Sequence, residues 1–227
     1  MLLYIVIMLP GILLTLWASF SVKNRFNKYF KVPAKSAYTG FQAAREILDR
    51  NGLKSVMIEE SRGMTADYYD PSTRVLKLSN NVMNLPSIAS IGIAAHEAGH
   101  AIQHAKKYSP LVIRQILVPI TQVSAWSFNI LIFIGLIFAG AFKFFGIMKI
   151  AIIFLLITVI FSIITLPVEF NASKRAKKML ESYGIITSKE KSGISEVLNA
   201  AAMTYVGAAA SSILTLIYFV IGTRSND

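Results

Sequence analysis

Apolar residues gather in four long stretches that polar segments separate. The stretches are Leu2–Phe20, Ile116–Phe142, Ile147–Val168 and Ala200–Ile221. A helix needs about 20 mostly apolar residues to cross the hydrocarbon core of a bilayer. The pattern therefore predicts a mainly α-helical membrane protein with about four transmembrane helices. A cleaved signal peptide is the alternative for the first stretch, but Ala18-Ser19-Phe20 is a poor cleavage site and no basic residues precede it, which favours a retained anchor.

The polar segment between the first two stretches predicts a small folded α+β unit. Thr39 is placed to cap a helix over residues 41–50, which Asn51-Gly52 would end. A strand is expected over 56–60, a hairpin with its turn at Asp70-Pro71-Ser72 over 65–79, and a helix over 87–107.

These elements suggest a division of the chain into five parts. The predicted parts are an N-terminal transmembrane anchor (1–20), a small α+β unit (21–110), two transmembrane helices (116–168), a polar helix that opens at Glu169 (169–199) and a last transmembrane helix (200–222).

The distribution of charged residues along the chain indicates an orientation in the membrane. The net charge is +11, and only 15% of the residues are charged, against roughly 25% in soluble domains. Thirteen Lys and Arg lie in 21–110 and six in 169–199, whereas the other two polar segments hold two and one. Basic residues mark the cytoplasmic side of membrane proteins. We therefore expect both basic segments in the cytoplasm, both chain ends outside, and no nucleic-acid partner.

Candidate chemistry is confined to one short segment. The chain has no cysteine, and its three histidines are His96, His100 and His104. Residues four apart share one face of a helix, so the imidazoles of His96 and His100 can reach one zinc ion. Glu97 can take a proton from a water molecule that the metal activates, as in His-Glu-x-x-His peptidases. The alternative is that His96 and His100 are merely polar residues on a helix that binds no metal. Burying unpaired histidines in this apolar segment would, however, cost free energy.

A catalytic zinc ion needs a third protein ligand and an open position for water. His104 lies eight residues after His96, about 12 Å along a straight helix, so it could bind the same ion only if the helix bends. Glu169 is the other candidate, because an even number of membrane crossings returns it to the side of His100. The residues alone leave open whether Glu169 is a ligand or a surface carboxylate near a helix start.

The segments AAHEAGHAIQH, LSNNV, LPVEFNAS and TYVGAAA resemble those of the YugP-like neutral zinc metallopeptidases, which are bacterial membrane proteins. The resemblance covers nearly the whole chain and extends more distantly to the HtpX and CAAX-prenyl-protease group. It implies that His96, His100 and Glu169 bind zinc and that Glu97 is the general base. It also implies that residues 21–110 form a zincin-like unit, in which the strand VLKLS would lie at the sheet edge over the cleft. Ser173 stands where that group has an Asp, so its hydrogen bond would bring no charge to a zinc-bound histidine.

The predicted function is zinc-dependent hydrolysis of peptide bonds by a multi-pass membrane endopeptidase with its active site on the cytoplasmic side. Tyr205, at the start of the last apolar stretch, is a candidate for stabilising the oxyanion or an interfacial anchor. The expected partners are a peptide or protein substrate and the lipid bilayer; the sequence gives neither the natural substrate nor an oligomeric state. The rival functions are an intramembrane protease and a non-catalytic scaffold that binds zinc for structure.

Overall fold

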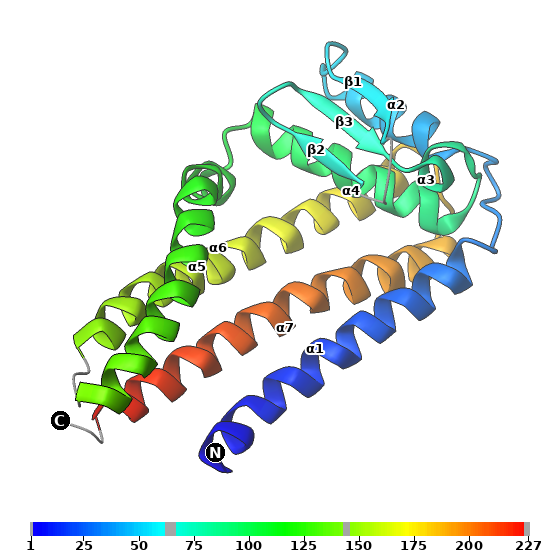
Figure 1. Ribbon diagram of the computed structural model, residues 1–227. Coiled ribbons are helices and arrows are strands. Elements are labelled where there is room, and N and C mark those ends of the chain that lie inside the picture. Colours follow the sequence, from blue (N-terminus) through cyan, green and yellow to red (C-terminus); the bar gives the residue numbers. More distant parts are fainter. Residues whose placement is uncertain (1, 62–66, 143–145, 225–227) are drawn as a thin grey trace. The chain divides into compact units, whose positions relative to one another are not determined.

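A computed structural model describes residues 2–61, 67–142 and 146–224 (Figure 1). Helices dominate the described residues, and three short strands form a sheet between the second and third helices. The elements are α1 (Leu2–Tyr29), α2 (Gly40–Arg50), β1 (Met57–Glu60), β2 (Tyr68–Asp70), β3 (Val75–Leu78), α3 (Asn80–Asn84), α4 (Ile88–Ala105), α5 (Ser109–Phe142), α6 (Gly146–Ser182) and α7 (Glu190–Arg224).

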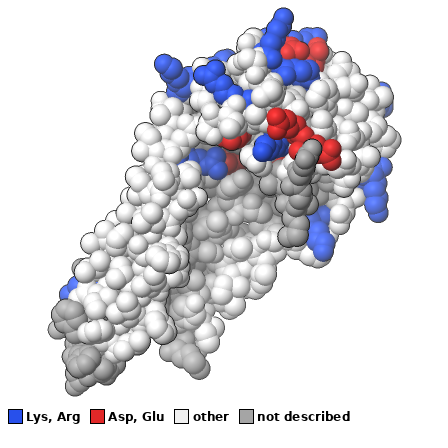
Figure 2. Space-filling model, turned by 45° about the horizontal axis from the view of Figure 1, so that its top comes forward, with Lys and Arg blue, Asp and Glu red and all other residues white. Residues whose placement is uncertain are grey.

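Four of the described helices, α1, α5, α6 and α7, are long and apolar enough to cross a membrane, which confirms the predicted number of spans. Large apolar side chains on these helices, such as Trp17, Trp126 and Phe133, are exposed. In water such exposure would be unfavourable, whereas lipid chains solvate apolar side chains. Figure 2 shows the matching charge distribution, with coloured Lys, Arg, Asp and Glu gathered over the sheet and its helices.

Each spanning helix is longer than its apolar stretch. α1 continues to Tyr29, and α7 already begins at Glu190. Hydropathy marks where apolar residues end, whereas backbone hydrogen bonds extend a helix into polar sequence. The expectation that Glu169 opens a new helix is wrong, because α6 runs without a break through Pro167. The proline ring removes one N–H donor, and the remaining backbone bonds keep the helix continuous.

The chain forms two compact units. The first comprises residues 1–18, 112–167 and 204–227, and the second comprises residues 19–111 and 168–203. In the first unit, α1 and α7 approach closely at small residues. A Cβ atom added to Gly207 would lie 3.1 Å from Thr15 Oγ1, and that hydroxyl lies 3.1 Å from Ser211 Oγ. Small residues and interhelical hydroxyl contacts are typical of helix packing in membranes.

The second unit contains the sheet, whose strand order is β1-β3-β2. β1 confirms the strand predicted over 56–60, and β2 and β3 form the predicted antiparallel hairpin. Residues 65 and 66 of the predicted hairpin lie outside the described residues. The expectation that VLKLS forms the sheet edge is wrong. β3 is central because β1 pairs with it in parallel along its other side, which leaves β2 as an edge strand.

Helix α4 is the core of the second unit. Its N-cap is Ser87, whose hydroxyl accepts the Ser90 N–H, and residues around its whole circumference are buried. A helix that is apolar all round is expected to be buried on every side. α2, β2 and β3 all pack against α4. The predicted helix over 41–50 is confirmed, with Thr39 forming a capping box with Gln42.

Candidate metal centre

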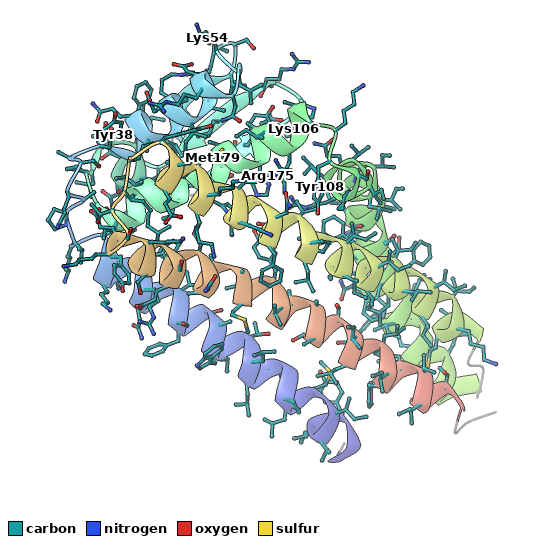
Figure 3. All side chains as sticks on the ribbon, turned by 180° about the vertical axis from the view of Figure 1, so that it is seen from behind. Tyr38, Lys54, Lys106, Tyr108, Arg175 and Met179 are labelled. Carbon is teal, nitrogen blue, oxygen red and sulfur yellow. The ribbon has the colours of Figure 1, made fainter. Side chains whose placement is uncertain are left out.

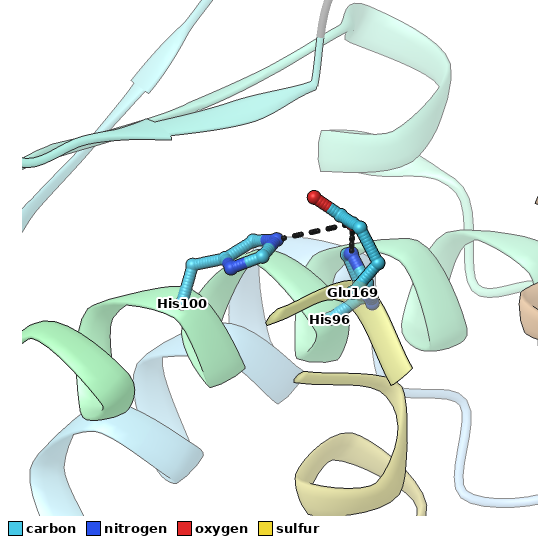
Figure 4. Close-up of side chains that lie close together, drawn as sticks. All are labelled: His96, His100 and Glu169. Atoms are coloured by element: carbon cyan, nitrogen blue, oxygen red, sulfur yellow. Dashed lines mark hydrogen bonds and ion pairs between the residues drawn. The ribbon is translucent and has the colours of Figure 1, made fainter. Parts of the chain in front are cut away.

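Helix α4 carries both histidines of the motif on one face. Figure 4 shows the imidazoles of His96 and His100 directed toward the carboxylate of Glu169, which comes from α6. The ring centroids of the two histidines are 4.7 Å apart. His100 and Glu169 are buried, and His96 is half-buried. The helical spacing thus brings two imidazoles to one point beneath the surface of the unit.

Glu169 completes a three-residue cluster, His96–His100–Glu169. Its Oε2 atom lies 3.2 Å from His96 Nε2 and 3.5 Å from His100 Nε2. One ligand atom from each residue lies within 4.8 Å of the other two, so the cluster can hold a metal ion. The residue types alone left the position of Glu169 open, and the structure brings it to the histidines.

The donor set and its spacing fit zinc. Two imidazole nitrogens and one carboxylate form a common ligand set of catalytic zinc sites. Ligand atoms about 2.0–2.1 Å from a tetrahedral ion lie roughly 3.3 Å from each other. The two separations of 3.2 and 3.5 Å between nitrogen and oxygen agree with that value. Three protein ligands would leave a fourth position for water.

Gly99 allows α4 and α6 to approach closely enough to form the cluster. A Cβ atom at Gly99 would lie 2.9 Å from the backbone oxygen of Ala172. Ala172 follows Glu169 by three residues and precedes Ser173, so the contact lies within one helical turn of the Glu169 carboxylate. Glycine lowers helix stability by about 1 kcal/mol relative to alanine, and here it provides the space that the site requires.

Both histidines have a neutral hydrogen-bond partner on the side away from Glu169. Ser173 Oγ lies 3.1 Å from His96 Nδ1, and Gln103 Oε1 lies 2.9 Å from His100 Nδ1. Ser173 thus makes a hydrogen bond without bringing a charge. Sequence reasoning missed Gln103, although a buried amide three residues after a candidate ligand shares its helical face.

Glu97 lies beside the cluster and is held by the sheet. Its Oε2 atom accepts a hydrogen bond of 3.1 Å from the backbone N–H of Tyr69 on β2. Burial raises the pKa of the Glu97 carboxyl, and the imidazoles of His96 and His100 offset that rise only in part. Burial lowers the pKa of His100, but the hydrogen bond to Glu169 and the charge of Glu97 outweigh burial, so the net pKa is raised.

The structure also describes the two remaining candidates, His104 and Tyr205. His104 Nδ1 shares a hydrogen bond of 2.9 Å with the Tyr69 hydroxyl, and His104 is not in the group of residues that could hold a metal ion. Tyr205 is half-buried on α7 in the first unit. Its role in stabilising an oxyanion stays a prediction, as do the catalytic role of Glu97 and the ligand roles of the cluster.

Comparison with known proteins identifies the family to which the chain belongs. One curated relative, "Putative membrane protease YugP" of Bacillus subtilis (strain 168), is 43% identical over 219 residues, which are 96% of this chain and 96% of that protein. No solved structure matches the chain significantly. A family model matches residues 4–224, nearly the whole chain. The chain therefore belongs to the family described as "Putative neutral zinc metallopeptidase".

Proposed function

We propose that the protein is a membrane-embedded zinc endopeptidase that hydrolyses peptide bonds in peptides or proteins. The observation that carries the proposal is the meeting of two imidazoles from α4 with a carboxylate from α6, directly beside a second, buried carboxylate. A structural zinc site needs only ligands, whereas a hydrolase also needs a base next to the ion. Glu97 supplies that base.

Each residue has a distinct role in this proposal. His96, His100 and Glu169 would hold the zinc ion, which when bound supplies a Lewis acid that activates water near neutral pH. Glu97 follows the first ligand in sequence and would take the proton from the attacking water. Its buried carboxyl has a raised pKa, which makes it a stronger base than an exposed glutamate. The Tyr69 N–H restricts the orientation of that carboxylate.

An extended substrate would lie along β2. This strand is at the edge of the sheet and packs against α4, the helix that carries Glu97. Edge strands leave backbone groups open to a further strand, and several peptide-binding domains use them in that way. Because the Tyr69 N–H already donates to Glu97, we expect the carbonyl groups of this edge to accept the substrate's N–H groups. This arrangement would be the zincin-like part of the fold.

The active site is proposed to face the cytoplasm. The support is the distribution of Lys and Arg, with nineteen in residues 21–110 and 169–199 and three in the other two polar segments. A topology reporter fused after Asp227 should therefore read as external, and a cytoplasmic reading would contradict this orientation.

The peptidase activity is tested with the purified full-length protein in detergent. Wild type should cleave an unfolded protein substrate, lose activity with a chelator and regain it with added zinc. Glu97→Gln should retain zinc and lose about 10²–10⁴-fold in cleavage rate, the range for a general base. Glu46→Gln is the matched control, because Glu46 lies on α2 and pairs with Arg50. Zinc binding by wild type without any cleavage would instead support a scaffold.

A further inference from the structure

We propose that Gln103 is a positioning residue that sets the tautomer of His100, so that His100 Nε2 is the atom presented to the metal. The inference rests on the proposed zinc site and adds a residue that acts through a ligand. Gln103 is fully buried and lies one turn after His100 on α4. A buried amide has few ways to satisfy its hydrogen bonds, and here its neighbours leave one orientation.

The orientation of the Gln103 amide follows from a partner that can only accept. Its Nε2 atom lies 2.8 Å from the backbone oxygen of Val168. A carbonyl oxygen has no hydrogen to donate, so the NH2 group must face it. The amide oxygen must then face His100, where Oε1 and Nδ1 lie 2.9 Å apart. Because the amide oxygen can only accept, His100 Nδ1 must carry the hydrogen.

The consequence concerns the other nitrogen of the ring. In neutral imidazole one nitrogen carries the hydrogen and the other has the free lone pair. With Nδ1 protonated, the lone pair of His100 lies on Nε2, which is 3.5 Å from Glu169 Oε2. Two acceptor atoms that face each other in a buried site need a proton or a metal ion between them, and the proposed zinc ion would take that place. His96 is held differently, because the Ser173 hydroxyl can donate or accept and therefore imposes no tautomer.

Asn171 and Arg175 of α6 hold the Gln103 amide in place. Asn171 Oδ1 accepts from Gln103 Nε2 at 3.1 Å and from Arg175 Nε at 2.7 Å. Arginine can only donate, so it fixes which atom of the Asn171 amide points inward. The Arg175 guanidinium lies 6.0 Å from the ring centroid of Tyr108, and Figure 3 labels both residues. The network thus leads from His100 to a half-buried arginine on α6.

Zinc affinity of the full-length protein, measured by competition with a chelator, tests the inference. Gln103→Met keeps the side-chain length and removes the acceptor, so the affinity should fall about 10–100-fold, the usual range for a partner of a ligand. Gln103→Glu keeps an acceptor for Nδ1–H and should bind zinc more tightly than Gln103→Met. Ser173→Ala is the matched control at the other histidine and should lose less affinity. Equal affinity in wild type and Gln103→Met would overturn the inference.

Nitrogen NMR gives a readout that a merely structural role would not move. The chain has three histidines, so the protein labelled with ¹⁵N-histidine has few signals to assign. In the metal-free protein at a pH where imidazoles are neutral, wild-type His100 should be protonated at Nδ1. Gln103→Met should show a mixture of both tautomers, and the same pure tautomer in that variant would overturn the inference.

Two further results distinguish a failure of the role of Gln103 from a failure of the proposed zinc peptidase function. If Gln103→Met fails to fold, Arg175→Met tests the same network from its outer end and should weaken zinc binding to a smaller extent; unchanged affinity there would overturn the relay through Asn171. A wild-type protein that binds no zinc would overturn the proposed function. A wild type that binds zinc as tightly as its Gln103 variants would overturn only the role of Gln103.

Discussion

Helix α4 presents one face to α6 and another to β2, and the polar residues on these two faces are held in different ways. On the face toward α6, His96 and His100 each contact Glu169 and a second polar residue, and Gly99 allows close backbone packing. On the face toward β2, Glu97 and His104 both bond to one residue, Tyr69. The side with the proposed ligands is therefore fixed by several contacts, whereas the side with the proposed base depends on one residue of a three-residue edge strand.

This difference matches the proposed roles of the two sides, with metal binding toward α6 and proton transfer toward β2. Metal ligands must stay within a few tenths of an ångström of their positions, and partners on neighbouring groups provide that precision. A general base must reach a water molecule and then pass its proton on, which a single hydrogen bond permits. Substitutions on the α6 side should therefore change zinc affinity, and substitutions on the β2 side should change cleavage without changing zinc content.

The largest effect is expected from removing a ligand. Glu169→Gln replaces a charged ligand with a neutral amide and leaves two histidines, which are a poor zinc site. Zinc content and cleavage should both fall to background, as they should in His100→Ala. His104→Ala should retain its zinc. The opposite result, with zinc lost in His104→Ala and kept in Glu169→Gln, would mean that α4 bends and that His104 is the third ligand.

The second-largest effect is expected at Gly99 of α4, with Gly92 of the same helix as the control. In Gly99→Ala the new Cβ atom would lie 2.9 Å from a backbone oxygen of α6, so the helices must move apart at a cost of about 1–3 kcal/mol. In Gly92→Ala the new atom would meet the Ile194 side chain at an ordinary 3.4 Å. That variant should gain about 0.5–1 kcal/mol of helix stability. Thermal unfolding and zinc competition measure both, and equal behaviour would refute the close α4–α6 contact.

A smaller effect is expected on the β2 side. Tyr69→Phe removes the hydrogen bond to His104 and keeps the backbone N–H that holds Glu97. Stability should fall by about 0.5–1.5 kcal/mol, cleavage by a few fold, and zinc affinity not at all. Tyr68→Phe is the control, because the Tyr68 side chain points to the opposite face of the strand. A loss of zinc in Tyr69→Phe would show that the two faces are coupled.

The smallest effect concerns the turn that ends β2. Asp70 accepts hydrogen bonds from Ser72 and Thr73, and those bonds lower its pKa from 3.8 to about 2. A lowered pKa means that the carboxylate stabilises the fold above pH 3.8 and that this contribution disappears as the pH falls toward 2. Asp70→Ala should cost less than about 1 kcal/mol at pH 6, since the group is exposed. Unfolding curves of both proteins should converge in acid.

Local patterns predicted much of this molecule. The four spans follow from runs of apolar residues, and the helix that carries His96 follows from the helical pattern over residues 87–107. The Thr39 capping box and the turn after Asp70 also depend on residues a few positions apart. Such elements are predictable because the interactions that stabilise them lie within a few residues along the chain.

Contacts between distant segments were harder to predict. The central position of β3 depends on its pairing with β1, and hydrophobic alternation does not encode strand order. The place of Glu169 depends on how α6 packs on α4, so the residues alone left it open and only the resemblance favoured it. Gln103 was missed although it lies one turn from His100, because the orientation of its amide depends on the Val168 carbonyl of α6. Tyr69 was missed because its contact with Glu97 is a backbone hydrogen bond between distant parts of the sequence.

X-ray absorption at the zinc edge tests the central claim most directly. The claim is that the α6-facing side of α4 and Glu169 together form the metal site. In the zinc-loaded wild type, the spectrum should fit two imidazole nitrogens with oxygen ligands at about 2.0–2.2 Å. The same fit should be retained in Glu97→Gln, because Glu97 is assigned to the β2 side. A spectrum that requires three imidazoles, or one that changes in Glu97→Gln, would contradict the account.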